Sequence, residues 1–332
     1  MQQVSGEHIA VSAPGSVAGQ VFQERRGWRE IWRQVKRDRF LYLLAAPSLL
    51  YFVVFHYIPM AGIIIAFMDY DPFMGVEAMF DFSNWVGFKH FQNFFNSIFF
   101  WNVMRNTLVI SLYKLMWSFP IPILLALLIN EVRHNWFKRS VQTISYLPHF
   151  FSIVVVAGIV KAMLTTQGGL VNQLVVFLGG EPKAFLTDPN LFRGILVTTT
   201  VWQTAGWSSI IYLAAMATIN PELYEAATVD GANRFQRMLY ITVPSISFAI
   251  VITLIFAIGG LLNAGFEQIL LLYSPAVYEV ADIIDTYVYR VGLLGRQYSF
   301  GAAIGLFKSV LALLLMVIAN QIARRLGQPG LW

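Results

Sequence analysis

Residues 220–244 read NPELYEAATVDGANRFQRMLYITVP and form a polar segment between two long apolar stretches of the chain. The segment is too long for a simple turn, and its glycine and prolines stand where such residues begin and end helices. It therefore looks like an ordered connection between two apolar elements. Its charged side chains are Glu222, Glu225, Asp230, Arg234 and Arg237.

Local chemistry predicts two short helices joined at a glycine within this segment. Asn220 is a preferred N-cap residue, and Pro221 is a preferred first residue of a helix. Gly231 suits the left-handed conformation that ends many helices. A second helix is predicted to run from Ala232 and to stop before Pro244.

Side chains near the glycine suit contact with another protein. Ala226 and Ala227 are small, so a partner's backbone is able to approach closely. Glu225 and Asp230 are placed to bind a partner's arginine or local backbone amides. The residues alone leave two interpretations open, a docking element and an ordinary amphipathic connector.

Composition places the chain in a membrane. Of its 332 residues, 57% are hydrophobic and 12% are charged, against about 25% charged in a typical soluble domain. The mean hydropathy is +0.61, and the apolar residues gather into stretches able to cross a hydrocarbon core of about 30 Å. Cysteine is absent, which excludes disulfides, thiol catalysis and cysteine metal sites.

Six membrane-spanning helices are predicted, which makes the fold all-α. Prolines within or at the ends of the spans predict kinks, which neighbouring helices tolerate by satisfying the freed carbonyl groups. The predicted spans cover residues 40–68, 104–129, 141–164, 192–218, 245–265 and 302–323, and the prolines are Pro47, Pro59, Pro120, Pro122 and Pro148.

Two segments are predicted before the first span. Residues 1–24 are rich in Ser, Gly, Val and Gln without periodicity, and we expect a disordered cytoplasmic tail. Residues 25–39, RRGWREIWRQVKRDR, carry seven basic residues and one apolar helical face. We expect a basic amphipathic helix on an anionic membrane surface, followed by a transmembrane domain over residues 40–325.

The distribution of basic residues predicts the orientation in the membrane. Fourteen lysines and arginines fall in the leader, the loop at 130–140, the polar segment and the C-terminal tail, whereas the opposite loops are acidic. Under the positive-inside rule, both termini and residues 220–244 face the cytoplasm. The longer loops at 69–103 and 266–301 face the other side.

The polar segment also carries a motif at fixed spacing. EAATVDGANRFQRMLYITVP resembles the EAA loop of binding-protein-dependent ABC import permeases, with Met238 and Val243 where that pattern usually has Phe and Leu. Further stretches over residues 40–332, including SYLPHFFSIVVVAGIV, resemble the LplB-like sugar and polysaccharide branch of these permeases. The matching motif residues are Glu225, Ala226, Ala227, Asp230, Gly231, Ala232, Ile241 and Pro244.

This resemblance implies a fold, a function and partners. It implies the six-helix type I ABC importer permease (MetI-like) fold, in a permease that imports oligosaccharides or polysaccharide fragments across a bacterial inner membrane. A second permease, a homodimeric ABC ATPase and an extracytoplasmic sugar-binding protein are the implied partners. The implied ATPase-coupling residues are Glu225, Ala226, Ala227, Asp230, Gly231 and Ala232.

The sequence shows no catalytic apparatus of its own. It lacks the G-x-x-x-x-G-K-[ST] phosphate loop, so we expect ATP and Mg on the partner ATPase and no cofactor on this chain. Its five histidines lack paired metal-ligand spacing, and no metal site is expected. We therefore expect a subunit that is not an enzyme.

Ionisable side chains within spans are candidates for a substrate path, because they are costly there without a function. Lys114 lies near the middle of the second predicted span, where it either lines a path or pairs with a partner's carboxylate. Lys161 and Lys308 lie nearer the outer ends, where snorkelling is the alternative to lining a path.

Two mixed aromatic and polar groups are further path candidates, with interfacial aromatics and close helix contacts as the alternative. Aromatic faces beside hydrogen-bonding groups suit sugar rings, and a polyanionic sugar would favour the lysines. Alginate oligosaccharides, carried by importers of this branch, are one candidate substrate. The residues are Trp202, Gln203, Trp207, Ser208 and Ser209 in the fourth span, with Asn263, Glu267 and Gln268 near the outer end of the fifth.

Two other functions compete with the importer. A proton-coupled secondary carbohydrate carrier requires buried carboxylates, and the predicted spans hold almost none. A membrane-embedded polysaccharide enzyme requires clustered carboxylates at the outer face. The nearest candidates, Asp282 and Asp285, are predicted to share one polar helix face.

Overall fold

The structure, a computed structural model, describes residues 32–33, 36–325, 327 and 330. Across these residues it consists of helices and loops, with an isolated bridge between Met68 and Trp85 as the β-type pairing. The chain divides into one unit that ends at Ala61 and a second that begins at Gly62. The predicted tail over 1–24 and most of the predicted helix over 25–39 lie outside the described residues.

The first unit holds most of the apolar helix that the sequence predicts over 40–68, and the last part of this helix belongs to the second unit. It is built from α2 (Arg39–Phe52), the π-helical turn η1 (Val53–Tyr57) and α3 (Ile58–Met60), and helical structure continues to Phe67. Proline removes a backbone donor and crowds the preceding turn, and the wider π turn lies directly before Pro59. The helix therefore accommodates this proline without ending.

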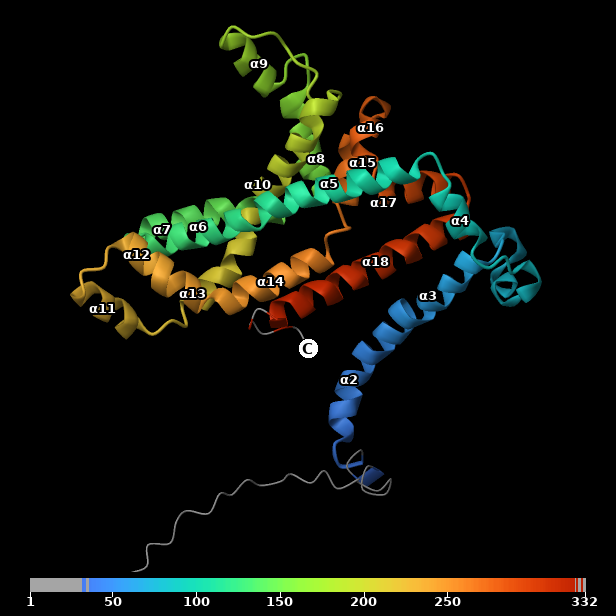
Figure 1. Cartoon of the computed structure of the whole chain (residues 1–332), viewed down its shortest axis with the longest axis horizontal. Coiled ribbons are helices and arrows are strands. Elements are labelled where there is room, and N and C mark those ends of the chain that lie inside the picture. Colours follow the sequence, from blue (N-terminus) through green and yellow to red (C-terminus); the bar gives the residue numbers. More distant parts are fainter. Residues whose placement is uncertain (1–31, 34–35, 326, 328–329, 331–332) are drawn as a thin grey trace, which may run out of the picture. The chain divides into compact units, whose positions relative to one another are not determined.

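The second unit contains the remaining helices, of which α5, α10 and α18 are the longest (Figure 1). In chain order they are η2 (Ala61–Phe67), η3 (Pro72–Met74), η4 (Val76–Phe80), η5 (Phe82–Asn84), α4 (Lys89–Phe95), α5 (Phe100–Ser118), α6 (Pro120–Glu131), α7 (Asn135–Tyr146), η6 (Leu147–Phe150), α8 (Ile153–Leu164), α9 (Leu170–Phe177), α10 (Pro189–Met216), α11 (Pro221–Val229), α12 (Arg234–Arg237), η7 (Met238–Thr242), α13 (Val243–Ser245), α14 (Ser247–Gly259), α15 (Phe266–Leu272), η8 (Pro275–Val277), α16 (Tyr278–Ala281), α17 (Ile284–Tyr287), η9 (Val288–Leu294) and α18 (Tyr298–Arg325). Of these, η7 and η9 are π-helical and the other η elements are 3₁₀-helical.

Three helices among the described residues are long and apolar enough to cross a membrane by length and composition. They are Arg39–Phe67, Phe100–Glu131 and Tyr298–Arg325, and they correspond to the first, second and sixth predicted spans. Phe100–Glu131 combines α5 and α6, which meet at Phe119 just before Pro120.

The third and fifth predicted spans are bent. The prediction of one span over 141–164 is wrong in shape, because α7 with η6 makes an angle of 100° with α8 across residues 151–152. The prediction over 245–265 extends too far: α14 ends at Gly259 and lies at 62° to the helix before Ile246. If each bent pair counts as one span, the described part of the chain holds up to five.

Helix α10 stands where the fourth span is predicted. It packs against α5, α6, α7 and η6, at the centre of the second unit. It is not among the helices that qualify as membrane spans by length and composition, because its Thr, Ser, Gln and Trp side chains lower its hydropathy. The predicted count of six spans is therefore not established by these criteria.

Three clusters of buried side chains hold the second unit together. The first joins α5, α8, α10 and the segment from α15 to Ile283 around Phe192 and Ile269. The second joins α4, α5, α17 and α18 around Phe94. The third joins α6, α10 and the start of α14 around Tyr212. Segments far apart in the sequence thus share each cluster.

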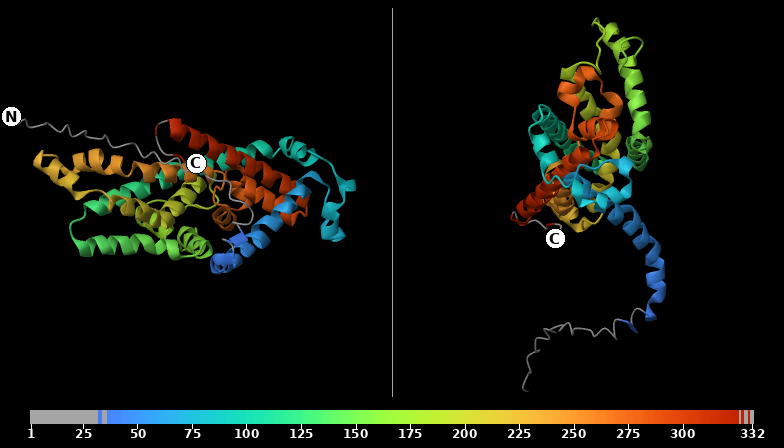
Figure 2. Two further views of the ribbon diagram at one scale, coloured as in Figure 1. Left: turned by 90° about the horizontal axis from the view of Figure 1, so that it is seen from below. Right: turned by 90° about the vertical axis from the view of Figure 1, so that its right-hand side faces the viewer.

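The second unit has two distinct ends. The connection formed by α11 and α12 lies at one end, and α4 with the 3₁₀ segments η3 to η5 lies at the other (Figure 2). Helices α8 and α9 project from the side of the helical bundle (Figure 1). The polar segment therefore lies at one end of the second unit, where Met238 and Val243 pack against the third cluster.

Candidate functional site

The polar segment over 220–244 folds into α11, a glycine turn and α12. Asn220 caps α11, because its side-chain oxygen accepts a hydrogen bond from the backbone N–H of Glu222 at 3.0 Å. Pro221 is the first residue of this helix. Both features of the predicted helix start are confirmed.

Gly231 ends α11 in the left-handed conformation, as predicted, with a φ of +79°. Its N–H donates to the carbonyl oxygen of Thr228 at 3.1 Å, and the N–H of Ala232 donates to the carbonyl oxygen of Ala227 at 2.8 Å. This pair of hydrogen bonds is the Schellman motif. Glycine fits because other L-residues are strained at this φ.

The second helix of the segment differs from the prediction at both ends. Asn233, one residue after the predicted start, caps α12 through a capping box with Gln236, whose two hydrogen bonds measure 2.8 and 2.9 Å. Helical structure then continues through η7 into α13. The predicted stop before Pro244 is wrong, because the wider π-helical turn η7 lies just before Pro244 and the helix continues through this proline.

Two hydrogen bonds tie the arms of the segment together. The Arg237 side chain donates to Oγ1 of Thr228 at 2.7 Å. The hydroxyl groups of Tyr224 and Thr242 lie 2.9 Å apart. The segment is therefore a preformed elbow that holds its own shape, and we call residues 220–244 the elbow.

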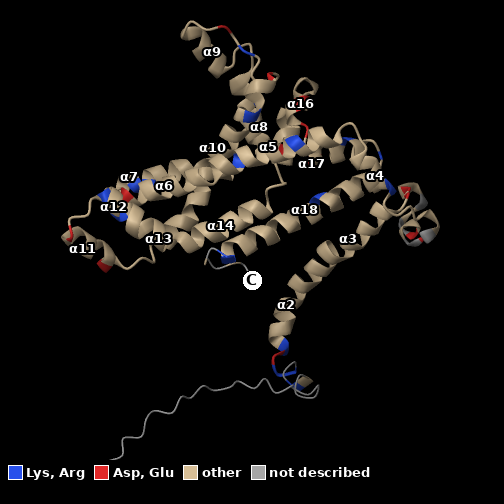
Figure 3. Ribbon diagram, in the orientation of Figure 1, with Lys and Arg blue, Asp and Glu red and all other residues tan. Residues whose placement is uncertain are grey.

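The elbow presents acidic and apolar side chains to its surroundings. Glu225 and Asp230 are exposed, and their side chains make no hydrogen bond or ion pair with any described residue. Val229 is 89% exposed and Phe235 is 65% exposed. Lysine and arginine residues gather around α7 and α12 at the same end of the unit (Figure 3). The predicted contact of Glu225 and Asp230 with local amides is absent here, which leaves both acids available to a partner.

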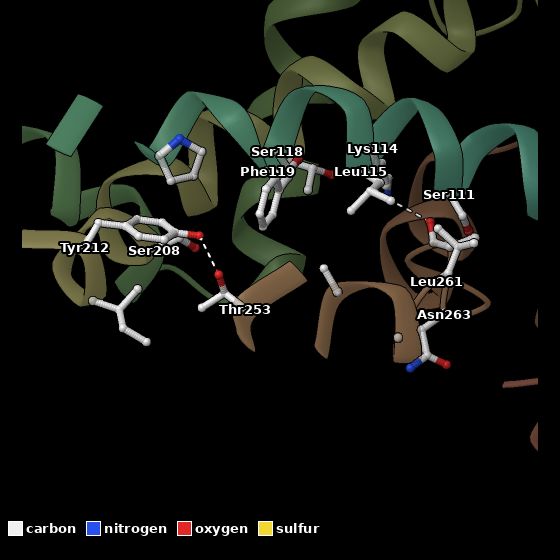
Figure 4. Close-up of a pocket in the computed structure, with 16 residues that line it drawn as sticks. Ser111, Lys114, Leu115, Ser118, Phe119, Ser208, Tyr212, Thr253, Leu261 and Asn263 are labelled. Carbon is white, nitrogen blue, oxygen red and sulfur yellow. Dashed lines mark hydrogen bonds between the residues drawn. The ribbon is translucent and has the colours of Figure 1, made fainter. Parts of the chain in front are cut away.

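A cavity of about 360 Å³ lies among α5, α6, α10 and α14 (Figure 4). Its wall mixes apolar side chains such as Leu115 and Phe119 with hydroxyl groups. The hydroxyl of Tyr212 forms a hydrogen bond of 2.9 Å with Thr253 across one part of it. The cavity is thus lined by several spans and is partly polar.

Lys114 lies on the wall of this cavity. Its Nζ donates to the carbonyl oxygen of Ala264 at 2.8 Å and to Oε1 of Gln268 at 2.7 Å. Oε1 of Gln268 also accepts from Thr200 at 3.0 Å. Lys114 therefore contacts neutral oxygens of its own chain, and no described carboxylate forms an ion pair with it.

The structure separates the predicted path residues of α10. Ser208 lines the cavity of Lys114, whereas Trp202 lines a groove of about 870 Å³ between α5 and α10. The ring of Trp207 stacks on His149 with centroids 4.5 Å apart, beside the α7–α8 bend. The buried Ser209 donates to a carbonyl of its own helix. The predicted group therefore does not form a single site.

The other predicted path residues are also divided between places. Asn263 lines the cavity of Lys114, while Gln203 donates to the carbonyl oxygen of Phe151 at 3.2 Å. The side chains of Glu267 and Lys161 are exposed. The polar cluster predicted after the fifth span thus splits, with Gln268 buried and Glu267 turned outward.

Lys308 has a carboxylate partner in its own chain. Its Nζ lies 2.7 Å from both carboxylate oxygens of Asp285 and 3.0 Å from Oδ1 of Asn263. This ion pair links α17 to α18. Lys308 is therefore held by a carboxylate partner rather than snorkelling. The sequence around Lys308 could not indicate this partner, because Asp285 lies 23 residues away.

The prediction that Asp282 and Asp285 share one helix face is wrong. Asp282 ends α16 and Asp285 lies in α17, with the extended residue Ile283 between the two helices. Asp282 is buried and accepts two hydrogen bonds from Arg290, at 3.0 and 2.5 Å. These charge-assisted hydrogen bonds raise the pKa of Arg290 above its ordinary value. Arg290 also lies over the ring of Tyr278, 4.7 Å from its centroid.

Over the described residues, the chain combines apolar helices, a partly polar cavity and an exposed elbow, which suit the membrane component of a transporter. The family model for "Binding-protein-dependent transport system inner membrane component" matches residues 118–328. The chain belongs to this family, so it is a multi-pass, non-catalytic subunit of an ABC transporter, as the sequence predicts.

Two relatives from Bacillus subtilis (strain 168) match nearly the whole chain. The polygalacturonan/rhamnogalacturonan transport system permease protein YteP is 45% identical over 94% of this chain and 96% of its own length. Protein LplB is 46% identical over 90% of this chain and 92% of its own length.

Solved structures show the same fold. A chain of a bacterial ABC transporter involved in the import of the acidic polysaccharide alginate is 43% identical, with a TM-score of 0.82 over 89% of this chain and 99% of that chain. A second solved structure is the bacterial alginate ABC transporter in complex with alginate pentasaccharide-bound periplasmic protein. One of its chains matches with a TM-score of 0.83 and 43% identity, over 91% of this chain and 100% of that chain. The predicted type I ABC permease fold is confirmed at this level.

Proposed function

We propose that this chain is the transmembrane permease subunit of an ATP-driven importer of oligosaccharides or polysaccharide fragments. The permeases and transporters that it is similar to are named for polygalacturonan, rhamnogalacturonan and alginate. Alginate oligosaccharides remain one candidate among these substrates. The relatives' names thus support a carbohydrate of several sugar units.

The elbow is the proposed site of coupling to a separate ATPase. It is exposed at one end of the second unit, held in shape by its own hydrogen bonds, and presents Glu225 and Asp230, which pair with no residue in the described part of the chain. Ala226 and Ala227 give a close approach along α11. This preformed, partner-free surface is the observation that carries the proposal. ATP and Mg are bound by the ATPase, and this chain carries no cofactor.

A second, related permease completes the proposed translocation path. The groove between α5 and α10 supports this, because Trp117 and Trp202 line it and are 54% and 46% exposed. Large exposed aromatic side chains in a membrane component are suited to contact with a neighbouring subunit or a sugar. An extracytoplasmic binding protein delivers the substrate from the opposite face.

The proposed topology has six spans with both termini in the cytoplasm. Helix α10 supplies the fourth span, and its polar side chains are tolerated because neighbouring helices surround it. The two bent helix pairs supply the third and fifth spans. The basic residues around α7 and α12 support a cytoplasmic elbow under the positive-inside rule.

Co-purification combined with charge reversal tests this function. A tagged chain, solubilised gently from native membranes, is expected to retain a second permease and two ATPase copies. Glu225→Lys is expected to abolish ATP-dependent oligosaccharide uptake with normal membrane insertion. Glu222→Lys is the matched control, because Glu222 lies in the same helix but its carboxylate binds Asn220.

The outcomes separate the importer from a carrier. Normal uptake in the Glu225→Lys variant would remove the coupling role. Uptake that survives ATP depletion and collapses with the proton gradient would instead favour a secondary carrier.

A further inference from the structure

The cavity beside Lys114 contains hydrogen-bonding groups that its own chain does not use. The Oγ atoms of Ser111 and Ser118 are buried and have no hydrogen-bond partner among the described residues. Both residues line the cavity, on the same helix as Lys114 (Figure 4). Buried polar atoms are nearly always hydrogen-bonded, so two orphan hydroxyls in one cavity indicate a missing polar occupant.

The spacing of these residues places their side chains together. Ser111, Lys114 and Ser118 stand three and four residues apart in α5, and such positions share one face of a helix. The cavity therefore has an ammonium group flanked on both sides by buried hydroxyl groups that have no hydrogen-bond partner among the described residues.

Lys114 also retains capacity to bind an anion. An ammonium group has three N–H donors, and two of them are used by the oxygens of Ala264 and Gln268. No described carboxylate neutralises its charge. Since an unpaired cation away from water is costly, an anionic occupant would stabilise this arrangement.

The backbone next to Lys114 leaves space for its ammonium group. Gly265 has a φ of +90°, and a Cβ built there would overlap Nζ of Lys114. Only a glycine at this position is compatible with the observed place of the ammonium group. The site is therefore shaped by two segments, α5 and the loop that follows α14.

We infer that this cavity is a subsite for the carboxylate of one acidic sugar residue, with Lys114 binding the carboxylate and Ser111 and Ser118 donating hydrogen bonds to the same residue. The inference rests on the proposed function and narrows its substrate class to uronate oligosaccharides. A volume of about 360 Å³ lies at the lower end of the range for small-molecule pockets, about 300–1,000 Å³. The side chains of Leu115 and Phe119 supply an apolar surface for the sugar ring.

Thiol labelling inside the cavity tests this subsite. The chain has no cysteine, so Ser118→Cys introduces a single thiol beside Lys114. The whole transporter, purified through a tag on this chain, is treated with an anionic methanethiosulfonate (ethylsulfonate) or a cationic one (ethyltrimethylammonium). Mass spectrometry of this chain then gives each labelling rate without interference from other subunits.

The charge of Lys114 is expected to control these rates. In the Ser118→Cys background, Lys114→Met is expected to lower the ratio of the anionic to the cationic labelling rate by about a hundredfold, about tenfold for each reagent, as loss of a unit charge at close range predicts. The ratio is the readout because Lys114 also changes the thiolate fraction, which affects both reagents equally. Lys114→Arg is the matched control that keeps the charge, and the rates are expected to stay near those of the parent. Labelling rates that do not depend on the charge at position 114 would overturn the inference. A thiol that neither reagent labels would overturn it as well.

Ligand protection identifies the occupant. An oligogalacturonate is expected to slow labelling of the thiol, and its carboxyl-reduced counterpart of equal length and linkage is not. Equal protection by both sugars would overturn a carboxylate-specific subsite. Failure of protection by either sugar, while the rates still depend on Lys114, would also overturn the subsite, because the cavity would then be charged but not occupied by the sugar.

The proposed function has a separate readout in the same preparation. If the purified transporter imports oligosaccharides with ATP but fails the labelling tests, the subsite is rejected and the permease function stands. If it imports no oligosaccharide, the proposed function itself fails.

Discussion

Gly231 gives a quantitative test of the elbow. Its φ of +79° costs an L-residue roughly 1–2 kcal/mol, and a β-branched valine falls at the upper end of that range. No atom lies within 4 Å of a Cβ built there, so a steric clash adds nothing to the backbone term. Since each 1.36 kcal/mol is tenfold, a cost of about 2 kcal/mol lowers the equilibrium ratio of capped to uncapped elbow about thirtyfold.

We therefore expect Gly231→Val to reduce transport without reducing the amount of chain in the membrane. ATP-dependent oligosaccharide uptake into proteoliposomes is expected to fall by about tenfold or more. Gly231→Asn is the matched control, because asparagine adopts the left-handed conformation more readily than other non-glycine residues. The asparagine variant is expected to keep most of the activity.

Either of two results would refute this reasoning. Wild-type uptake by the valine variant would show that the left-handed cap is not needed for coupling. An equal loss in both variants would place the defect in the added side chain rather than in the backbone.

Two further predictions concern the packing of the second unit, with the thermal unfolding midpoint in detergent as the readout. Gly206→Ala is expected to destabilise the protein by about 1–3 kcal/mol, because the new Cβ would overlap the carbonyl oxygen of Ser145. Gly194→Ala in the same helix is the control. Its new Cβ meets no atom, and the variant is expected to stabilise the protein by about 0.5–1 kcal/mol. Lys308→Met is expected to lower the midpoint, because it leaves Asp285 unpaired. Adding Asp285→Asn to this variant is expected to recover part of the loss. If the midpoint shift of the double variant equals the sum of the two single shifts, the pairing is contradicted.

Local chemistry predicted the elbow better than any other part of the chain. The cap at Asn220 and the turn at Gly231 depend on backbone geometry and hydrogen bonds within a few residues, so the sequence contains the needed information. The second helix was predicted less well, because a π-helical turn before Pro244 lets the helix continue where proline usually ends it.

Bends and partners could not be predicted in the same way. The break before α8 depends on the extended Phe151 and on Ser152, which caps α8. Both residues lie within an apolar run, so the sequence predicted a single straight span there. The partners of Lys114 and Lys308 come from segments 150 and 23 residues away, so only the tertiary fold brings them together. Asp282 and Asp285 are three residues apart, yet the extended Ile283 separates their helices.

Cross-linking from the elbow tests the central claim most directly. Val229 is 89% exposed in α11, and Ile98 is 87% exposed in the loop after α4. Helices α11 and α4 lie at opposite ends of the second unit (Figure 2). Because the chain has no cysteine, Val229→Cys or Ile98→Cys places one thiol at either end. Native membranes are then treated with a short thiol-to-amine cross-linker. The account predicts an adduct between the Val229→Cys chain and an ATPase subunit, and no ATPase adduct from Ile98→Cys. An ATPase adduct from Ile98→Cys alone, or from neither position while the ATPase is present in the membranes, would contradict it.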